Sequence, residues 1–487
     1  MFETLKTLNA DPILGLMAEF RNDPREQKID LGVGIYRDQR GNTPIMKSVA
    51  EAEKKRIETE ITKAYIGPAG SESFNLLTRE LTLGEDHPAI KDNRLASVQT
   101  PGGCGALRVG AELIKRTNPT CTIWVSEPTW ANHIPLLGNT GLKIREYPYY
   151  SPETQSLRRK EMLDVLQKVP ANDIVLLHGC CHNPCGVDLG LEDWKEIADL
   201  AEKQGFIPFV DLAYQGLGLG LAEDAAGLRF LAAQTSEMII ATSYSKNFGL
   251  YRERVGALQI IAENAQTAQI TQAQLGSTVR GIYSMPPAHG AAIVELILGD
   301  TTLYKSWDTE LSAMRNRINN LRESLSNHLS KETDQDFTFI KKQRGMFSFL
   351  GINETEINEL KKDFGVYMVD SSRINVAGIN DSNLEQEAKD IITTIDHFKN
   401  EVNMAVTGNI QPRLSKKTSA DLASLVEFDL KIIEQLNEVS EMSLEIADNS
   451  SNIGSRPRNL SEMKKNLTKC RNYFRERTKF IGGVKNV

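Results

Sequence analysis

Long apolar runs are missing from this sequence, and so is an excess of charge of either sign. No run approaches the roughly 18 apolar residues that a membrane-spanning helix needs. The first residues, MFETLKTLNADPILGL, lack the charged start and the apolar stretch of a signal peptide. The 57 Lys and Arg residues against 64 Asp and Glu residues leave a net charge of -7, so no overall field draws the chain to nucleic acid or anionic lipid. We therefore expect a cytoplasmic protein that acts on neither membranes nor nucleic acid.

Cysteine is also scarce, with 6 residues among 487, which is too few for a disulfide scaffold and favours a reducing compartment. Cys180, Cys181 and Cys185 lie beside His178 and His182 at a spacing typical of metal ligands. A second spaced pair is missing, however, and the first two cysteines directly follow an apolar run. Buried cysteines at a strand end therefore explain the pattern better than zinc does, and we predict no metal site.

What the chain does have is an ordinary globular composition, with 40% hydrophobic and 25% charged residues. That composition excludes a membrane, collagenous or disordered protein. At about 150 residues per domain, a chain of 487 residues allows roughly three units, or two units with an appendage.

Between about residues 95 and 262, short β-branched runs alternate with amphipathic stretches. The alternation predicts an α/β fold, with a mostly parallel sheet between helices on both faces. From about residue 305, a long charged helix and two shorter strands indicate a smaller α+β unit. The predicted strands of the sheet cover residues 121–125, 173–178, 206–213, 237–245 and 255–261, and a predicted helix covers 191–205.

Polar side chains follow four of these five strands. Ligands of open α/β sheets bind at the carboxyl ends of the strands, so we expect these side chains to meet there. Upstream, a glycine-rich turn at residues 100–110 opens a helix and presents unpaired N–H groups to an anion. The strand-end groups are Ser126 to Trp130, His178 to Asn183, Asp211 with Tyr214, and Ser243 to Lys246.

Three kinds of cofactor site can be compared with this set. An NAD site needs the pattern G-x-G-x-x-G, which Gly102, Gly103, Gly105 and Gly110 do not fit, and a P-loop needs Gly-Lys-Ser/Thr, which is absent. Pyridoxal phosphate explains all parts together, because a lysine forms its Schiff base, an aspartate pairs with its pyridinium nitrogen, and a helix N-terminus holds its phosphate. We therefore favour pyridoxal phosphate.

Nine segments of the chain resemble the class I, fold-type I aminotransferases, specifically the aspartate and aromatic amino acid subgroup. They occur in the family's order across about residues 1–400, which chance does not explain. The segments are DPILGL, IDLGVGIYRD, TPGGCGALR, HNPCG, DLAYQG, SYSKNFGLYRERVG, YSMPPAHG, RGMFSFLG and SSRINVAG. The resemblance implies a fold-type I transferase that works as a homodimer with shared active sites.

The resemblance also implies how pyridoxal 5'-phosphate is bound. Lys246, Asp211 and Tyr214 would be catalytic: the lysine forms the Schiff base and later moves the substrate proton, and the aspartate keeps the ring nitrogen protonated. Tyr214 and Asn183 would hydrogen-bond the phenolic oxygen, and Trp130 would stack on the ring. A further set of residues would hold the phosphate: Gly103, Cys104, Ser243, Ser245, Arg254 and, from the neighbouring subunit, Tyr65.

The substrate residues follow from the same resemblance. Arg373 matches the arginine that clamps the α-carboxylate in a bidentate fork. Arg280 matches the one that reaches across the dimer to a side-chain carboxylate. Gly34 would offer its backbone to the substrate, and Trp130 and Asn183 would contact it as well.

The chain departs from the family at three positions. Cys104 replaces the usual Thr or Ser of the phosphate cup, Cys185 replaces the Thr of HNPTG, and Met285 stands where Asn or Ser is common. None of these changes removes a catalytic group. His133 and His178 resemble histidines behind the cofactor, and a role as ordinary core histidines stays open for both.

The residues after about 400 match no part of the family. Residues 420–448 repeat leucine, isoleucine or valine every seven positions and carry eight acidic residues and one basic residue. Residues 456–479 carry nine basic and two acidic residues. This pattern predicts a C-terminal helical hairpin whose faces attract each other, and the alternative is a basic helix that binds nucleic acid or a membrane surface.

These observations lead to one expected activity and one alternative. We expect transamination of aspartate, aromatic amino acids (tyrosine, phenylalanine) or both with 2-oxoglutarate, by a ping-pong route, with the preferred donor open. The alternative is a regulator that binds pyridoxal phosphate, contacts nucleic acid and has little turnover. The expected division of the chain is 1–44 arm and part of the small domain, 45–310 large domain, 311–400 small domain, 401–419 linker and 420–487 helical extension.

Overall fold

The structure is a computed structural model that describes residues 2–7, 12–332, 336–380 and 389–394. All of these belong to the compact unit that spans Met1–Phe398. The predicted linker at 401–419 and helical hairpin at 420–487 lie outside the described residues.

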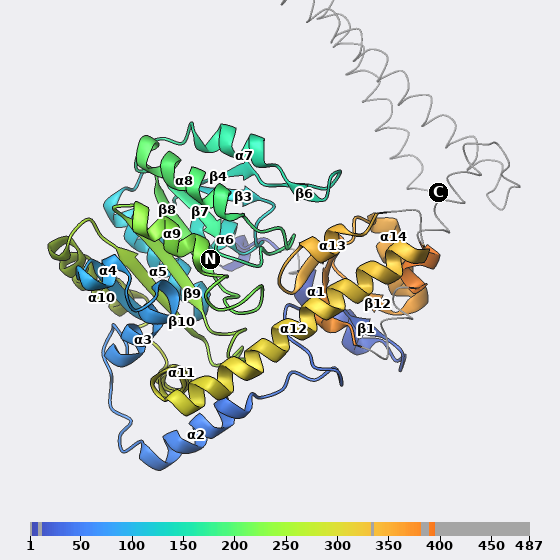
Figure 1. Ribbon diagram of the computed structural model, residues 1–487, viewed down its shortest axis with the longest axis horizontal. Helices are drawn as coiled ribbons and strands as arrows, with labels where there is room; N and C mark the ends of the chain where they lie inside the picture. The colour runs from blue at the N-terminus through green and yellow to red at the C-terminus, as the bar shows by residue number, and fades with distance from the viewer. Residues whose placement is uncertain (1, 8–11, 333–335, 381–388, 395–487) are drawn as a thin grey trace, which may run out of the picture. The chain divides into compact units, whose positions relative to one another are not determined.

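The centre of the unit is a seven-stranded sheet (Figure 1). All of its strands run parallel to one another except β10, which is antiparallel to both of its neighbours. In spatial order the strands are β2 (Leu95–Pro101), β10 (Val255–Ile261), β9 (Met238–Ser243), β8 (Ile207–Leu212), β7 (Ile174–His178), β3 (Thr122–Glu127) and β4 (Lys143–Pro148).

Apolar side chains on both faces of each central strand explain why these runs form a buried sheet. Phe209 packs into one core cluster and the next residue, Val210, into the other. Helices α5 and α10 cover the first face and α8 and α9 the second. The five predicted strands and the helix predicted at 191–205 are thereby confirmed, and α8 ends where Gly205 takes a left-handed conformation.

Two strands of the sheet were not among the predictions. Strand β2 carries buried polar residues such as Gln99, whose side chain donates to the carbonyl oxygen of Pro287 at 2.7 Å, so its sequence does not look apolar. Strand β4 lies at the edge of the sheet and is largely exposed. Strand β10 also departs from the parallel pattern, because residues 244–254 lead straight back from β9 without a crossover helix.

Helices and short strands surround this sheet (Figure 1). They are α2 (Lys47–Thr59), α3 (Glu72–Leu83), α4 (Pro88–Lys91), α5 (Gly102–Thr117), α6 (His133–Gly138), β5 (Tyr150–Ser151), β6 (Ser156–Leu157), α7 (Arg159–Leu166), α8 (Leu191–Gln204), α9 (Ala226–Gln234), α10 (Ala265–Ile282) and α11 (Ala288–Gly299).

A smaller group of elements has its own core, and the long helix α12 (Thr301–Glu332) joins it to the sheet. Trp307 of α12 packs in the core of the sheet, whereas Leu325 packs in the smaller core. The N-terminal part joins this group, because β1 pairs in parallel with β12. The remaining elements are η1 (Phe2–Thr4), α1 (Pro12–Asn22), β1 (Ile29–Asp30), α13 (Phe339–Lys342), β11 (Phe347–Phe349), α14 (Glu354–Glu359), η2 (Leu360–Phe364), β12 (Val366–Tyr367), β13 (Arg373–Asn375) and η3 (Val376–Gly378).

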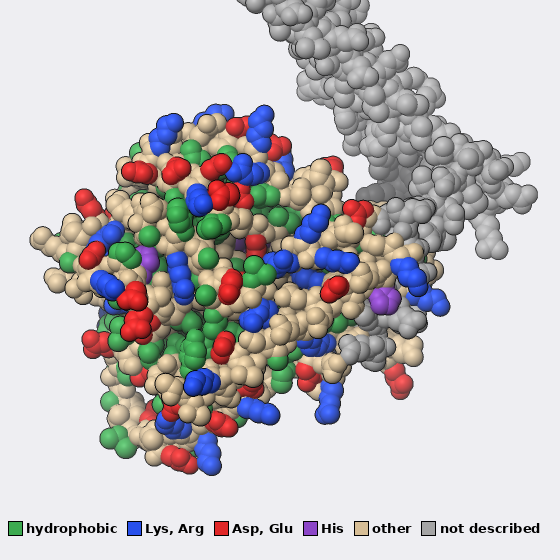
Figure 2. All heavy atoms as spheres, in the orientation of Figure 1, with side chains coloured by type: hydrophobic (Ala, Val, Ile, Leu, Met, Phe, Trp, Pro, Cys, Tyr) green, Lys and Arg blue, Asp and Glu red, His purple; other side chains and the backbone are tan. Residues whose placement is uncertain are grey.

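The two cores support the division of the first 400 residues into a large and a small domain. We propose the boundaries 1–44, 45–310 and 311–400 for it. On the face shown in Figure 2, acidic and basic side chains are interspersed. Within the described ranges, no helix combines the length and the apolar character needed to cross a membrane.

Candidate active site

A cavity of about 270 Å³ opens at the carboxyl edge of the sheet. It is lined by residues at or just after the ends of β3, β7, β8 and β9, by the start of α5, and by four residues of the smaller group and its N-terminal part. Most of the site residues predicted from the sequence come together here: Gly34, Gly103, Cys104, Trp130, Asn183, Asp211, Tyr214, Ser243, Ser245, Lys246, Arg254 and Arg373.

Two predicted site residues do not line this cavity. Tyr65 is 92% exposed, and Arg280 is exposed near the end of α10, where its guanidinium lies against Ser284. Both were expected to act on a neighbouring subunit. Met285 and Cys185 do not line the cavity either; Cys185 is buried, with its Sγ 3.2 Å from His182 Nδ1.

One end of the cavity has the properties of an anion site. Helix α5 begins after Pro101 without a side-chain cap, which leaves the N–H groups of its first turn available to an anion. Gly103 and Cys104 of this turn line the cavity. Gly102 has a φ of +72°, and a Cβ there would collide with the guanidinium of Arg254. Arg254 Nη1 in turn donates to Ser245 Oγ at 3.2 Å. These donors and this charge fit a phosphate group.

A chain of hydrogen-bonding side chains supports Asp211 from behind. Its Oδ2 lies 3.1 Å from Nε2 of the fully buried His133. Thr129 Oγ1 lies 2.8 Å from His133 Nδ1 and 3.1 Å from His178 Nε2. Burial alone raises the pKa of Asp211, but the hydrogen bond from His133 and the favourable electrostatics of the groups around the carboxylate outweigh it, so the pKa lies below its usual value. Asp211 therefore stays ionised and can hold a protonated ring nitrogen.

Lys246 provides the amine of the cavity. Its side chain lines the cavity just after β9, with Nζ 4.9 Å from the centre of the Tyr214 ring. Burial lowers the pKa of Lys246, which increases the fraction of uncharged, nucleophilic amine near neutral pH. Burial raises the pKa of Tyr214, so this residue stays a phenol that can donate a hydrogen bond.

Arg373 forms the opposite wall, at the start of β13. Nη2 donates to the carbonyl oxygen of Gly32 at 2.6 Å and Nη1 to Asn183 Oδ1 at 3.3 Å. Nε is buried and has no hydrogen-bond partner among the described residues. A buried donor without a partner indicates an acceptor supplied by a ligand, and a carboxylate fits the fork of this guanidinium.

Sequence reasoning missed Phe347, on β11. The centre of its ring lies 4.4 Å from the guanidinium carbon of Arg373. A Cβ on Gly34 would come within 2.6 Å of Cζ of the Phe347 ring. It also meets Tyr214 edge to face at 6.1 Å between ring centres. Phe347 lies inside the matching segment RGMFSFLG, but an apolar residue in a short strand gives no signal of a contact with a distant arginine.

Comparisons with known proteins cover the region that contains this cavity. The family model "Aminotransferase class I and II" matches residues 26–391. The aspartate aminotransferase of Haemophilus influenzae is 46% identical over 397 residues, which are 81% of this chain and 100% of that protein. The aromatic-amino-acid aminotransferase of Paracoccus denitrificans is 45% identical over 393 residues, 80% of this chain and 99% of the relative. A similar solved structure is that of the aromatic-amino-acid aminotransferase of Burkholderia pseudomallei, covalently bound to pyridoxal phosphate. The two structures match with a TM-score of 0.80 at 38% sequence identity, over 81% of this chain and 99% of the Burkholderia chain.

The first prediction concerns the free Nε of Arg373. Arg373→Lys keeps the charge but removes the fork, so we expect the dissociation constant of a four-carbon dicarboxylate to rise about 10–100-fold, because one charge-assisted hydrogen bond contributes about 1.5–3 kcal/mol. Isothermal titration calorimetry measures this dissociation constant. The exposed Arg116→Lys is the control and should bind as the wild type does. Equal affinity of Arg373→Lys and the control would contradict the assigned clamp.

The second prediction concerns His178. Burial, with His133 beside it, lowers the pKa of His178 to about 3, whereas an unfolded histidine has a pKa of about 6.5. The unfolded chain therefore binds more protons between these values, and stability should fall as the pH drops from about 6.5 towards 3. We expect His178→Gln to flatten this fall in the unfolding midpoint between pH 7 and 4.5. The exposed His289→Gln serves as control, and the same slope in both variants would rule out the buried neutral histidine.

Proposed function

The chain belongs to the class I and II aminotransferases, and on that premise we propose that it transfers the amino group of aspartate, tyrosine or phenylalanine to 2-oxoglutarate. The resemblance seen in the sequence is thereby confirmed, as is the expectation of an aminotransferase that uses pyridoxal 5'-phosphate. The observation that carries the proposal is the convergence of Lys246, Asp211 and Arg373 on one cavity.

The residues present fit the cofactor. When bound, pyridoxal phosphate supplies an electron sink for the carbanion formed at the substrate Cα. The start of α5 with Ser243, Ser245 and Arg254 would hold the phosphate, and Asp211 would hold the proton on the ring nitrogen. Lys246 Nζ would bind the cofactor covalently and, once released, move the proton at the substrate Cα.

The substrate is oriented by its carboxylates. Arg373 would hold the α-carboxylate through Nε and Nη, with Phe347 keeping the guanidinium in place. We propose that Arg280 of a second copy holds the side-chain carboxylate of aspartate, glutamate or 2-oxoglutarate. Trp130, Leu107 and Phe347 add apolar surface to the cavity, which also suits an aromatic donor. The relatives include both an aspartate aminotransferase and an aromatic-amino-acid aminotransferase, which supports keeping both classes of amino donor in the proposal.

A homodimer with shared sites is part of the proposal. Around the end of α2, three large apolar residues are exposed: Ile57 by 79%, Ile61 by 97% and Tyr65 by 92%. Apolar side chains so close together on one segment favour a surface that a second copy covers. In that arrangement, Tyr65 and Arg280 would complete the cavity of the neighbouring chain.

The third prediction tests the chemistry. Purified wild-type protein should show an absorption band of covalently bound cofactor that disappears on adding aspartate or phenylalanine. Lys246→Ala should lose this band and at least about 10⁴-fold in rate, because it removes both nucleophile and proton carrier. The ratio of the two half-reaction rates identifies the preferred donor. A band that persists unchanged in Lys246→Ala would overturn the assignment.

The fourth prediction tests the shared sites. Neither Lys246→Ala nor Arg280→Ala alone should use aspartate efficiently. Mixed and reassembled, they should regain up to about a quarter of the wild-type rate, because half of the dimers are hybrids with one intact site of two. Lys246→Ala mixed with Asp211→Ala is the control and should regain nothing, since both residues belong to the same chain's cavity. Recovery in neither mixture would mean that Arg280 does not act across a dimer.

A further inference from the structure

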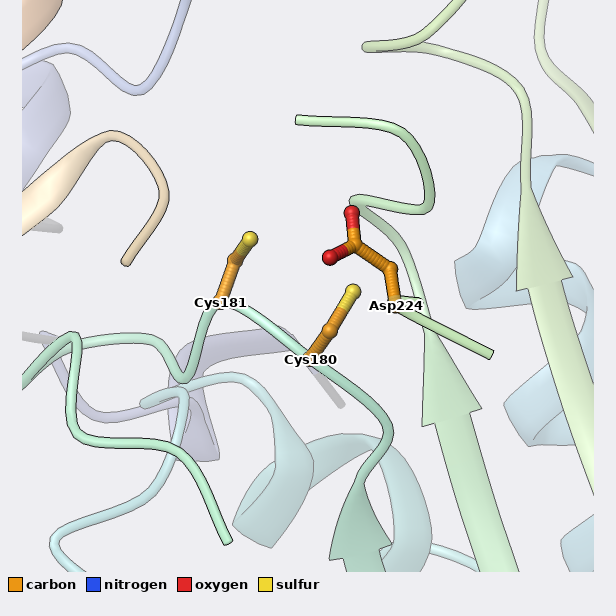
Figure 3. Close-up of side chains that lie close together, drawn as sticks. All are labelled: Cys180, Cys181 and Asp224. Carbon is orange, nitrogen blue, oxygen red and sulfur yellow. The ribbon is translucent and has the colours of Figure 1, made fainter. Parts of the chain in front are cut away.

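Two neighbouring thiols and a carboxylate converge beside the cavity. Cys180 and Cys181 follow β7, and both side chains point towards Asp224, which precedes α9 (Figure 3). One ligand atom from each of the three residues lies within 4.8 Å of the other two, and all three residues are buried. Cys180 also lines the cavity. The sequence pattern around Cys180 and Cys181 predicts no metal site, because it shows no further pair of ligands nearby. The structure adds Asp224, which is distant in the sequence, whereas Cys185 contacts His182.

The carboxylate of Asp224 is held firmly in place. It accepts hydrogen bonds from the backbone N–H groups of Gly216 at 2.8 Å, Gly218 at 2.9 Å and Leu219 at 2.7 Å. The backbone N–H of Gly220 interacts with it as well. Together these N–H groups fix the orientation of the carboxylate. A Cβ on Gly218 would lie only 3.1 Å from Cys181 Sγ, so backbone encloses the cluster closely on that side.

A buried positive charge lies next to the thiols. Arg322 is 1% exposed and donates to uncharged acceptors, among them the carbonyl oxygens of Gly345 at 2.9 Å and Ile340 at 3.1 Å. Its guanidinium interacts electrostatically with Cys181 and Asp188. A buried cation of this kind offsets negative charge on the groups around it.

From this geometry we propose that Cys180, Cys181 and Asp224 form an accessory site for a thiophilic divalent cation, Zn²⁺ or Cd²⁺. Two sulfurs and one carboxylate oxygen are ligands that such ions prefer, and the ion's fourth position can take water from the side of the cavity. Binding releases the two thiol protons and replaces water molecules on the ion, so no oxidant is involved. A disulfide between the two cysteines fits less well, because adjacent Cα atoms are about 3.8 Å apart and disulfides usually need at least about 4.4 Å.

A cation bound here would affect the catalytic groups through two short segments of the chain. Asp224 accepts hydrogen bonds from the backbone of Gly216 and Gly218, two and four residues after Tyr214. The two cysteines directly precede His182 and Asn183. Drawing the three ligands together around an ion shifts both segments. Inhibition of transamination is therefore the expected effect, and this consequence rests on the proposed function, whereas the binding itself does not.

The binding experiment uses the full-length protein with its cofactor and a titration with Cd²⁺, followed by thiolate-to-metal absorption and equilibrium dialysis. Wild-type protein should bind one more Cd²⁺ per chain than Cys180→Ser/Cys181→Ser, and Asp224→Asn should weaken this site at least tenfold. Cys121→Ser removes a buried cysteine from the other core and should bind as the wild type does. Equal stoichiometry and affinity in the double variant and the wild type would overturn the site.

A measurement on unmodified protein guards against a variant that fails to fold. X-ray absorption at one equivalent of Zn²⁺ should show two sulfur ligands at about 2.3 Å and oxygen at about 2.0–2.2 Å. A first shell of nitrogen and oxygen alone would overturn the proposal.

The activity experiment compares each variant with itself, with and without Zn²⁺. Zn²⁺ should lower the wild-type rate several-fold, a chelator should restore it, and the double variant should be unaffected. Equal inhibition of both would place the inhibitory ion elsewhere. Absence of transamination without Zn²⁺ would refute the proposed function and leave the binding result untouched.

Discussion

The site depends on keeping Asp211 ionised in a largely buried cavity. Burying a lone carboxylate is costly, and here His133 behind it and Lys246 in front of it offset that cost. The sheet makes this arrangement possible, because β8 and β9 are parallel neighbours and their carboxyl ends place Asp211 and the segment after Ser243 at one edge. Strand β10 then runs back from the same edge, so its start brings Arg254 to the anion end of the cavity.

The smaller group of elements contributes the wall that faces this edge. Helix α12 extends from one core into the other, and the pairing of β1 with β12 brings the N-terminal residues to the cavity. Arg373 then joins three separate parts of the chain, through Gly32, Asn183 and Phe347. A substrate carboxylate at its free Nε would complete this connection, which links substrate binding to the packing of the smaller group against the sheet.

Much of this could be predicted from the sequence. The buried strands have clear apolar patterns, and the polar residues at the strand ends, together with the glycine-rich turn, predict the cofactor class. The antiparallel direction of β10 could not be predicted, because a strand's own pattern does not encode the direction of its partner. The roles of Phe347 and of the Asp224 cluster depend on contacts between segments that are distant in the sequence. Local sequence patterns carry no information about such contacts. Tyr65 and Arg280 stay predictions because their expected contacts lie on a second copy, and the pattern at 420–479 lies outside the described residues.

The central claim is that Lys246 would carry the cofactor, with Asp211 holding the proton on its ring nitrogen and the start of α5 holding its phosphate. The most direct measurement is borohydride reduction of the purified protein, which fixes the bond between lysine and cofactor, followed by digestion and mass spectrometry. We expect one pyridoxyl group per chain, on the peptide that contains Lys246. A group on another lysine, or none on any peptide, would contradict it.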